Sequence, residues 1–422
     1  MSLFVYSAIL GFGLFGAPIF AVMSAFALSA FYFSGTELSA VSVEIYRLAG
    51  APTIITIPLF TFAGYVLAES KAPLRLLRLS NAFLGWMPGG TAIVCLFVCA
   101  FFTAFTGASG VTIIALGGLL YPILIQEGYS EKFTLGLITT SGSLGLLFPP
   151  SLPIILYGII AKVDIDQLFL AGLFPGLILM VILAVYSIYK ARHNKKMVKH
   201  HFCFKEICGA MWEARYEIPL PIFVLGGIYG GYVTATEASA LSAFYVLVAN
   251  TLITRDLSLT KDIPKVIVES LTLVGAILLI LCCALGLTNY LVDQEIPMKI
   301  LETMSSLITN KYLFLLVLNI FLLVVGCLMD IFSAIIVVVP LIIPIAEQFG
   351  VNPFHLAIVF LTNLEIGYIT PPVGINLFIS SFRFNRPVIE LYKVSIPFLF
   401  LMLLGLIMIT YIPWFTLFWL ES

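Results

Sequence analysis

Residues 142–151 read GSLGLLFPPS, and they interrupt a stretch from Phe133 to Ala161 that contains no charged residue. A run of 29 uncharged, mostly apolar residues is long enough for a membrane helix. Pro149 and Pro150, however, lack the N–H groups that continue a helix. The interruption leaves backbone groups unpaired where no water can satisfy them, so it needs a physical reason.

The composition is that of a polytopic membrane protein. Of the 422 residues, 61% are hydrophobic and 10% are charged, with a mean hydropathy of +1.11, whereas about a quarter of the residues in soluble domains are charged. The net charge of −1 gives no reason to expect a nucleic acid as partner. The chain begins without a basic segment ahead of its apolar residues, so we expect no cleaved signal peptide.

The proline pair recurs later in the chain. The stretch TPPVG at 370–374 lies 222 residues downstream, and four of the five prolines between positions 106 and 176 repeat at this offset. The sequence therefore divides into a first repeat (1–189), a basic connector (190–215) and a second repeat (216–422).

Each repeat contains a double-length apolar segment with a break at its midpoint. Segment 91–126 breaks at GASG, and segment 312–346 contains a single charge, Asp330, at its break. Arms of about 15 residues would measure roughly 22 Å, less than a hydrocarbon core of about 30 Å. We therefore predict two re-entrant helical hairpins, each followed by a discontinuous transmembrane helix, at 133–161 and 354–382.

Charged segments orient the two repeats. The connector is the most basic part of the chain and is expected in the cytoplasm, as are segments 255–265 and 383–393. Segment 71–79 is also basic. Segment 292–302, the repeat equivalent of 71–79, is net acidic. The repeats are therefore predicted to have inverted topologies. Residues 1–34 fit either two short segments or one kinked segment.

The breaks are predicted to form the transport site near the membrane midplane. Freed carbonyl oxygens and Ser, Thr or Asn oxygens are ligands that a hard cation prefers, and half-helix N-termini attract an anionic substrate. The cation-site candidates are Thr106, Ser109, Ser141, Ser143, Gly145, Pro149, Asp330, Asn363, Glu365, Gly367 and Thr370. The substrate-site candidates are Ser109, Gly110, Ser151, Ser333, Gly374 and Asn376.

These candidates have competing structural interpretations. A carboxylate at membrane depth is costly, which favours a functional role. Asp330 either contributes to a cation site or caps a hairpin helix, and Glu365 either contributes likewise or bonds to nearby backbone or to another subunit. Each hydroxyl or amide candidate is equally well explained by satisfying exposed backbone groups.

Three motifs resemble those of the large membrane subunit, DctM type, of tripartite ATP-independent periplasmic (TRAP) transporters. They are FTGASGVTIIALGGLLYP (105–122), SGSLGLLFPPSLPIILYG (141–158) and IGYITPPVGINLF (366–378), and the resemblance covers essentially the whole chain. It implies an elevator-type secondary transporter of the ion transporter superfamily in the bacterial inner membrane, with Na⁺ as coupling ion and no cofactor. It also implies two partners: a separate four-helix small membrane subunit, and a periplasmic substrate-binding protein that delivers a small organic acid such as a dicarboxylate or sugar acid.

Other functions fit the sequence less well. The main alternative is a carboxylate symporter of the same superfamily that works without a binding protein. A channel would need a continuous polar path, whereas the polar positions cluster at two breaks. An enzyme would need a nucleophile with its base or a metal cluster, and no His lies within the broken motifs, so we expect no enzymatic activity. A purely structural subunit would not need paired breaks.

Overall fold

The computed structural model describes residues 2–14, 17–35, 52–192, 203–294 and 310–419, together with positions 39, 43, 46 and 50. The secondary structure in these ranges is helical, which confirms the predicted all-α membrane protein. Within them, seven helices are long and apolar enough to cross a membrane, or up to nine if each of two bent helix pairs is one span. Connector residues 193–202 and most of the acidic segment 292–302 lie outside the described residues.

The first half begins with two short helices, α1 (Ser2–Leu14) and α2 (Ile19–Ser34), rather than one kinked segment. It continues with η1 (Pro52–Ile55), α4 (Thr56–Glu69), α5 (Ala72–Leu84), α6 (Gly90–Thr106), α7 (Ser109–Gln126), α8 (Glu131–Ser141), η2 (Leu144–Leu147), α9 (Leu152–Ala161) and α10 (Ile165–Arg192). The second half contains α11 (Phe204–Glu213), α12 (Pro219–Tyr229), α13 (Ala235–Val248), η3 (Ala249–Ile253), α14 (Asp262–Asp293), α16 (Lys311–Leu328), α17 (Ile331–Gln348), α18 (Pro353–Gly367), α19 (Ile375–Phe384), α20 (Val388–Tyr411) and α21 (Trp414–Leu417).

Both proline pairs interrupt a helix. The first break lies between α8 and α9, whose directions differ by 42° when η2 is counted with α8. The second break lies between α18 and α19, and Gly374 at its end has a φ of +52°, the left-handed region that favours glycine. In each break a cis peptide bond joins the two prolines.

Two glycines separated by the repeat offset bring each broken helix close to the hairpin arm before it. A Cβ atom on Gly145 would lie closer than 3.0 Å to the backbone of Ala100 in α6. A Cβ atom on Gly367 would lie equally close to the backbone of Gly326 in α16. The absence of a side chain at both positions therefore permits the two backbones to approach closely.

The two predicted hairpins correspond to the helix pairs α6–α7 and α16–α17. Three of these helices, α7, α16 and α17, are long and apolar enough to cross a membrane, so the re-entrant character of the hairpins stays a prediction. Their arms contain 17 or 18 residues, or roughly 26 Å of helix. The predicted arm length of about 15 residues is therefore too short. In the first pair, Gly107, with a φ of +64°, ends α6 and lets α7 begin only two residues later. In the second pair, Met329 and Asp330 alone separate the two helices.

The hairpins enter the bundle from opposite ends. The open end of the first lies beside the end of α10, since a Cβ on Gly89 would lie 3.0 Å from Ile188. The open end of the second lies beside the end of α20, where the rings of Tyr312 and Tyr411 have centroids 6.2 Å apart. The end of α10 and the start of α20 line one cavity, so the end of α20 is at the far side.

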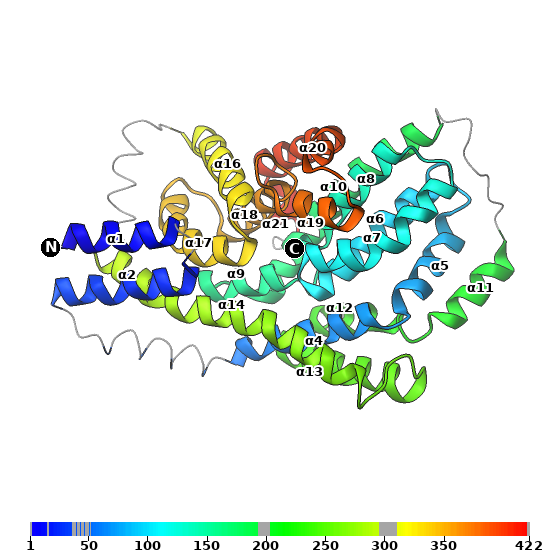
Figure 1. Cartoon of the computed structure of the whole chain (residues 1–422), viewed down its shortest axis with the longest axis horizontal. Helices are drawn as coiled ribbons and strands as arrows, with labels where there is room; N and C mark the ends of the chain where they lie inside the picture. The colour runs from blue at the N-terminus through cyan, green and yellow to red at the C-terminus, as the bar shows by residue number, and fades with distance from the viewer. Residues whose placement is uncertain are drawn as a thin grey trace.

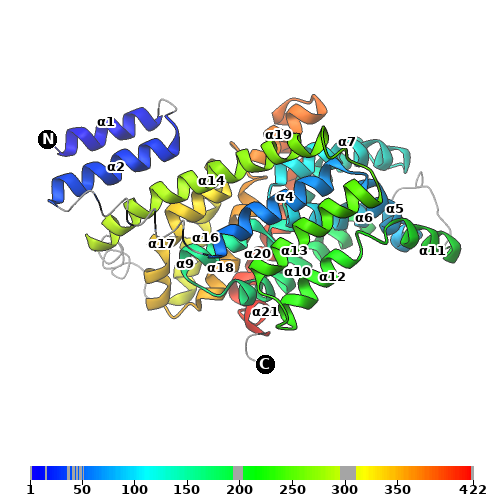
Figure 2. The ribbon, with the colours of Figure 1, turned by 90° about the horizontal axis from the view of Figure 1, so that it is seen from below.

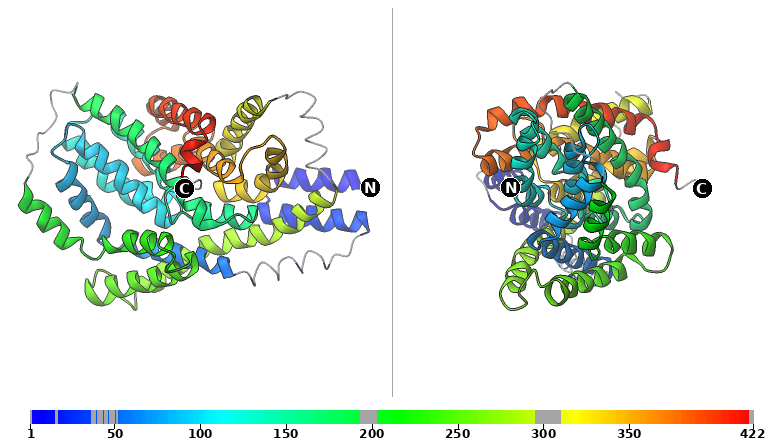
Figure 3. Two further views of the ribbon diagram at one scale, coloured as in Figure 1. Left: turned by 180° about the vertical axis from the view of Figure 1, so that it is seen from behind. Right: turned by 90° about the vertical axis from the view of Figure 1, so that its right-hand side faces the viewer.

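Helices of each half pack against helices of the other half. The second arm of the first hairpin, α7, packs against α19, whereas α17 packs against α9. Figure 1 shows α6–α10 and α16–α20 as one body, with α4, α12, α13 and α14 along its lower edge. The view from below in Figure 2 places this second group in front of the body, and Figure 3 shows both groups from behind and end on.

A network of charged side chains joins α5 to the segments that precede α12 and follow η3. Arg75 of α5 donates to Glu217, before α12, at 2.7 Å, and to Asp256, after η3, at 2.6 Å. The acidic side chains are only 2% and 5% exposed. The basic segment 71–79 therefore lies beside segment 255–265, which is predicted to be cytoplasmic.

Candidate functional site

The tip of the first hairpin meets the helix that follows the second break. The Ser109 hydroxyl donates to Oδ1 of Asn376 at 2.7 Å, and Nδ2 of Asn376 donates to the Thr139 carbonyl oxygen at 3.3 Å. Gly110 also contacts this helix, because a Cβ there would lie 2.6 Å from Ile379. Three predicted substrate residues, Ser109, Gly110 and Asn376, are thus brought together from opposite halves of the chain.

A hydroxyl group of the first hairpin also contacts the first break. Thr103, which was not among the predicted residues, places its hydroxyl 2.7 Å from the Gly142 carbonyl oxygen. Thr106, a predicted cation ligand, lies within the tip, with its hydroxyl 3.5 Å from the carbonyl oxygen of Ala108. At least one carbonyl in the first break is therefore already hydrogen-bonded by the protein.

The serines of the first break bond to their own backbone. Ser141, Ser143 and Ser151 donate to carbonyl oxygens three to five residues earlier, at 3.3, 3.2 and 2.5 Å. The Gly145 carbonyl oxygen accepts the N–H of Phe148 at 3.1 Å. All four residues are buried. Satisfaction of exposed backbone accounts for these contacts, and their role as ion or substrate ligands stays a prediction.

Asp330 caps the N-terminus of α17. Its Oδ1 accepts the N–H groups of Phe332 and Ser333, both at 3.0 Å, and its Oδ2 accepts the Ser333 hydroxyl at 2.5 Å. Tyr368, another residue absent from the prediction, accepts the Ile331 N–H at 2.8 Å. The structure therefore shows the capping role of Asp330, in which its negative charge also complements the helix dipole. The half-buried carboxylate retains lone pairs for a cation.

The second break is hydrogen-bonded to the tip of the second hairpin. The N–H of Gly374 donates to the Cys327 carbonyl oxygen at 3.2 Å, and Thr370 donates its hydroxyl to the Ile366 carbonyl oxygen at 2.8 Å. Pro371 and the residue after it are exposed, whereas the prolines of the first break are buried. The two breaks are therefore unequal, and the second is the more accessible.

Asn363 and Glu365 lie on opposite faces of α18. Nδ2 of Asn363 donates to Asn319 of α16 at 2.7 Å, in a polar network that continues to α20 and leads away from the break. Ile358 lies two turns before Glu365 on the same face of α18. It contacts α10, because a Cβ atom on Gly172 would lie 3.5 Å from its side chain. Glu365 therefore faces the first half of the chain.

The Glu365 carboxylate is the least compensated polar group of the two breaks. The residue is 0% exposed, and neither oxygen has a hydrogen-bond partner among the described residues. An isolated buried carboxylate is strongly unfavourable, so it must take up a proton or a cation. No group of three His, Cys, Asp or Glu residues within the described ranges could hold a metal ion.

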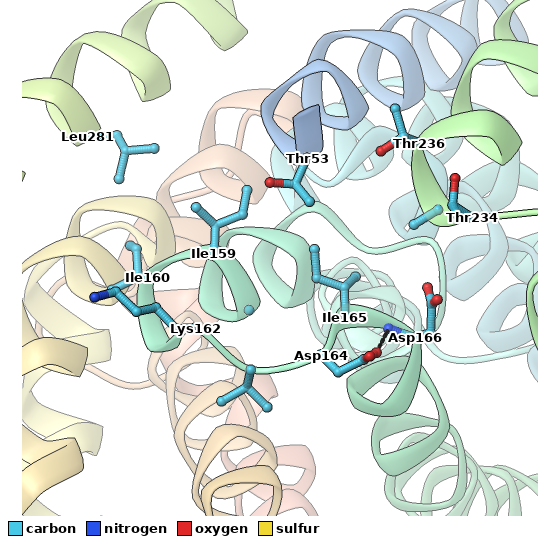
Figure 4. A pocket seen from close by; sticks show the side chains of 13 residues that line it. Thr53, Ile159, Ile160, Lys162, Asp164, Ile165, Asp166, Thr234, Thr236 and Leu281 are labelled. Atoms are coloured by element: carbon cyan, nitrogen blue, oxygen red, sulfur yellow. Dashed lines mark hydrogen bonds between the residues drawn. The ribbon is translucent and has the colours of Figure 1, made fainter. Parts of the chain in front are cut away.

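A cavity of about 480 Å³ lies at the boundary between the two helix groups. The turn between α9 and α10 contributes Lys162 and Asp164, and the first turn of α10 contributes Asp166. The opposite wall contains Thr53 and Thr236. Figure 4 shows these side chains around the space, with Asp164 accepting the backbone N–H of Asp166 at 2.9 Å. None of the predicted site residues lines this cavity, which is a gap between the helix groups rather than part of the breaks.

Comparison with known families agrees with the motifs. The family described as tripartite ATP-independent periplasmic transporter, DctM component, matches residues 3–415. The chain is 33% identical over 387 residues to the C4-dicarboxylate TRAP transporter large permease protein DctM of Pseudomonas aeruginosa, covering 92% of this chain and 90% of that protein. It is 31% identical to the ectoine/5-hydroxyectoine TRAP transporter large permease protein UehC of Ruegeria pomeroyi, covering 84% and 82%.

A further relative is longer than this chain. The chain is 36% identical to the isethionate TRAP transporter permease protein DctMQ of Oleidesulfovibrio alaskensis, over 85% of its own length but 57% of that protein. Among solved structures, the Alcanivorax borkumensis YdaH transporter is similar with a TM-score of 0.61 at 13% identity, over 90% of this chain and 88% of that one. Neisseria gonorrhoeae MtrF gives a TM-score of 0.59 at 13% identity, over 88% and 83%. These two likenesses concern the fold.

Proposed function

The chain belongs to the DctM family of tripartite ATP-independent periplasmic transporters, and on that premise we propose that it is the large permease subunit of a sodium-coupled importer of a small organic acid. It is a multi-pass protein of the bacterial inner membrane and not an enzyme. In the proposal, a periplasmic substrate-binding protein delivers the substrate, and a small four-helix membrane subunit completes the transporter.

The observation that carries the proposal is the convergence of a hairpin tip and a broken helix from different halves. Ser109 and Asn376 are buried and bonded to each other, although each lies beside the N-terminus of a helix, α7 or α19. Helix N-termini present free N–H groups that favour a carboxylate or sulfonate. An entering substrate would replace the hydrogen bond that these two side chains now make with each other.

The arrangement of the halves supports an elevator mechanism. The hairpins enter from opposite ends. The packing of α7 against α19, and of α17 against α9, joins both halves in one body. We propose that this body, α6–α10 with α16–α20, carries the substrate past α4, α13 and α14. The cavity in Figure 4 lies at the boundary across which such sliding would occur.

Sodium coupling rests on two carboxylates near the breaks. Buried Glu365 has no hydrogen-bond partner in the part of the chain that the structure describes, and Asp330 retains lone pairs beside the accessible second break. A Na⁺ ion would offset the negative charge of either group. The substrate class rests on the relatives' names, which cover C4-dicarboxylates, isethionate and ectoine.

Uptake measurements in proteoliposomes test the proposal. The chain is reconstituted with its small subunit, and uptake of radiolabelled organic acids is measured with the cognate binding protein outside. We expect uptake to require both an inward Na⁺ gradient and the binding protein. Equal uptake with K⁺ replacing Na⁺, at fixed pH and membrane potential, would refute sodium coupling. Uptake without the binding protein would instead favour a two-component symporter.

A further inference from the structure

A second cavity, of about 790 Å³, lies between α8, α10 and α20. Three lysines line it, one from each helix: Lys132, Lys190 and Lys393. All three are exposed, and none of them forms an ion pair with a described residue. The cavity thus gathers positive charge from elements that are far apart in the sequence.

Nearby acidic groups do not neutralise this cluster. One carboxylate, that of Glu390, also lines the cavity, which leaves an excess of positive charge. Glu131 is instead paired with Arg386, outside the lining. The ammonium group of Lys190 lies 5.5 Å from the centre of the Tyr186 ring, a contact that leaves it free to bind an anion.

The remaining lining of the cavity is mainly apolar. Phe133, Val394 and Phe398 are buried in it, and Pro397 is exposed beside it. From there an exposed apolar stripe continues along α20 through Phe400, which is 67% exposed. A soluble anion would use the lysines but not this surface. An amphiphile with an acidic headgroup would use both.

The lysines also indicate the depth of the cavity in the membrane. Lys190 is the first residue of the basic connector, which the positive-inside rule places in the cytoplasm. The cavity therefore lies where the headgroups of the cytoplasmic leaflet meet the acyl chains. Basic pockets between transmembrane helices on this side are suited to anionic lipids.

We propose that the cavity between α8, α10 and α20 binds the headgroup of an anionic phospholipid, with an acyl chain along the apolar stripe of α20. Lys132, Lys190 and Lys393 bind the phosphate, and Phe133 and Phe398 contact the glycerol and upper acyl region. The bound lipid joins helices of both halves at one end of the bundle. This site is separate from the two breaks and from the cavity of Figure 4.

Native mass spectrometry of the purified full-length chain in a neutral detergent tests the site. Short-chain phosphatidylglycerol is titrated at constant ionic strength, beside phosphatidylcholine of the same chain length and glycerol 3-phosphate. We expect phosphatidylglycerol to bind at least tenfold more tightly than phosphatidylcholine. Glycerol 3-phosphate should not displace it at equal concentration, because it lacks the acyl chains.

The decisive variant replaces Lys132, Lys190 and Lys393 with Gln. Each lysine near an anionic headgroup contributes about fivefold to binding, so affinity for phosphatidylglycerol should fall roughly 100-fold. The matched control replaces three other exposed lysines, Lys71, Lys205 and Lys261, with Gln and removes the same charge.

Three outcomes would overturn the proposal. The triple variant in the cavity could retain its affinity, or the control could lose as much, which would indicate non-specific electrostatic attraction. Displacement of the lipid by equal glycerol 3-phosphate would identify a site for a soluble phosphate. The thermal midpoint of each variant without lipid shows whether it is folded.

Discussion

Replacing Asp330 with Asn separates the two roles available to this residue. The cap requires an oxygen that accepts the N–H groups of Phe332 and Ser333, and the Asn side chain supplies one. Asn and Asp are comparable N-cap residues, so the cap should persist. The substitution removes the negative charge, which is the property that a cation site would use.

The expected magnitudes differ enough to distinguish the roles. Loss of a charge at a helix N-terminus costs about 0.3–1 kcal/mol of stability. Two unit charges 4 Å apart attract by about 4 kcal/mol at an effective dielectric constant of 20. Asp330 is half-buried and partly screened by solvent. We therefore expect about a third of that attraction, or an approximately tenfold loss of apparent sodium affinity.

The assay is the sodium dependence of uptake in proteoliposomes, with the thermal midpoint measured on the same preparation. Asp330→Ala is the companion variant, because it removes both the charge and the cap and should additionally lower stability by about 1 kcal/mol. If Asp330→Asn transports with the sodium dependence of the wild type, the carboxylate serves the cap alone.

Three further predictions follow from described contacts. Gly145→Ala should destabilise the protein by about 1–3 kcal/mol, because its Cβ would clash with backbone atoms. Gly226→Ala, with open space around its Cβ, is the neutral control. Equal thermal midpoints for the two variants would contradict the close-packing argument. Arg75→Met should cost about 3–5 kcal/mol by leaving two buried carboxylates uncompensated, and an unchanged midpoint would show that the network is dispensable. Ser109→Ala and Asn376→Ala should each reduce uptake, and a double-mutant cycle on substrate-dependent stability should give a coupling of at least about 0.5 kcal/mol, whereas strict additivity would place them in separate sites.

The local interruptions of the helices could be predicted because they follow from backbone chemistry. Proline removes an N–H group and glycine tolerates left-handed φ values, so the breaks at Pro149 and Gly374 lie where the sequence predicts them. Arm length was less predictable, because a single residue, Gly107, turns the chain at the tip. The GASG motif does not reveal how many of its residues remain helical.

The partners of the site residues could not be predicted in the same way. The bond between Ser109 and Asn376 depends on the packing of α7 against α19, which no local pattern encodes. Thr139 was missed for the same reason, since its carbonyl oxygen accepts a hydrogen bond from Asn376, which belongs to the other half. The sequence allowed Asp330 to be either a cap or a cation ligand, and the geometry resolves only the cap.

The packing of first-half helices against second-half helices has a consequence for biosynthesis. The helix α9 leaves the ribosome about 170 residues before its packing partner α17 begins. At about 5–20 residues per second, this delay lasts roughly 10–30 seconds. During that time the face of α9 that will contact α17 is covered by lipid or by the insertion machinery. The nascent first half is therefore a membrane-inserted intermediate, and the body assembles only when the last third of the chain arrives.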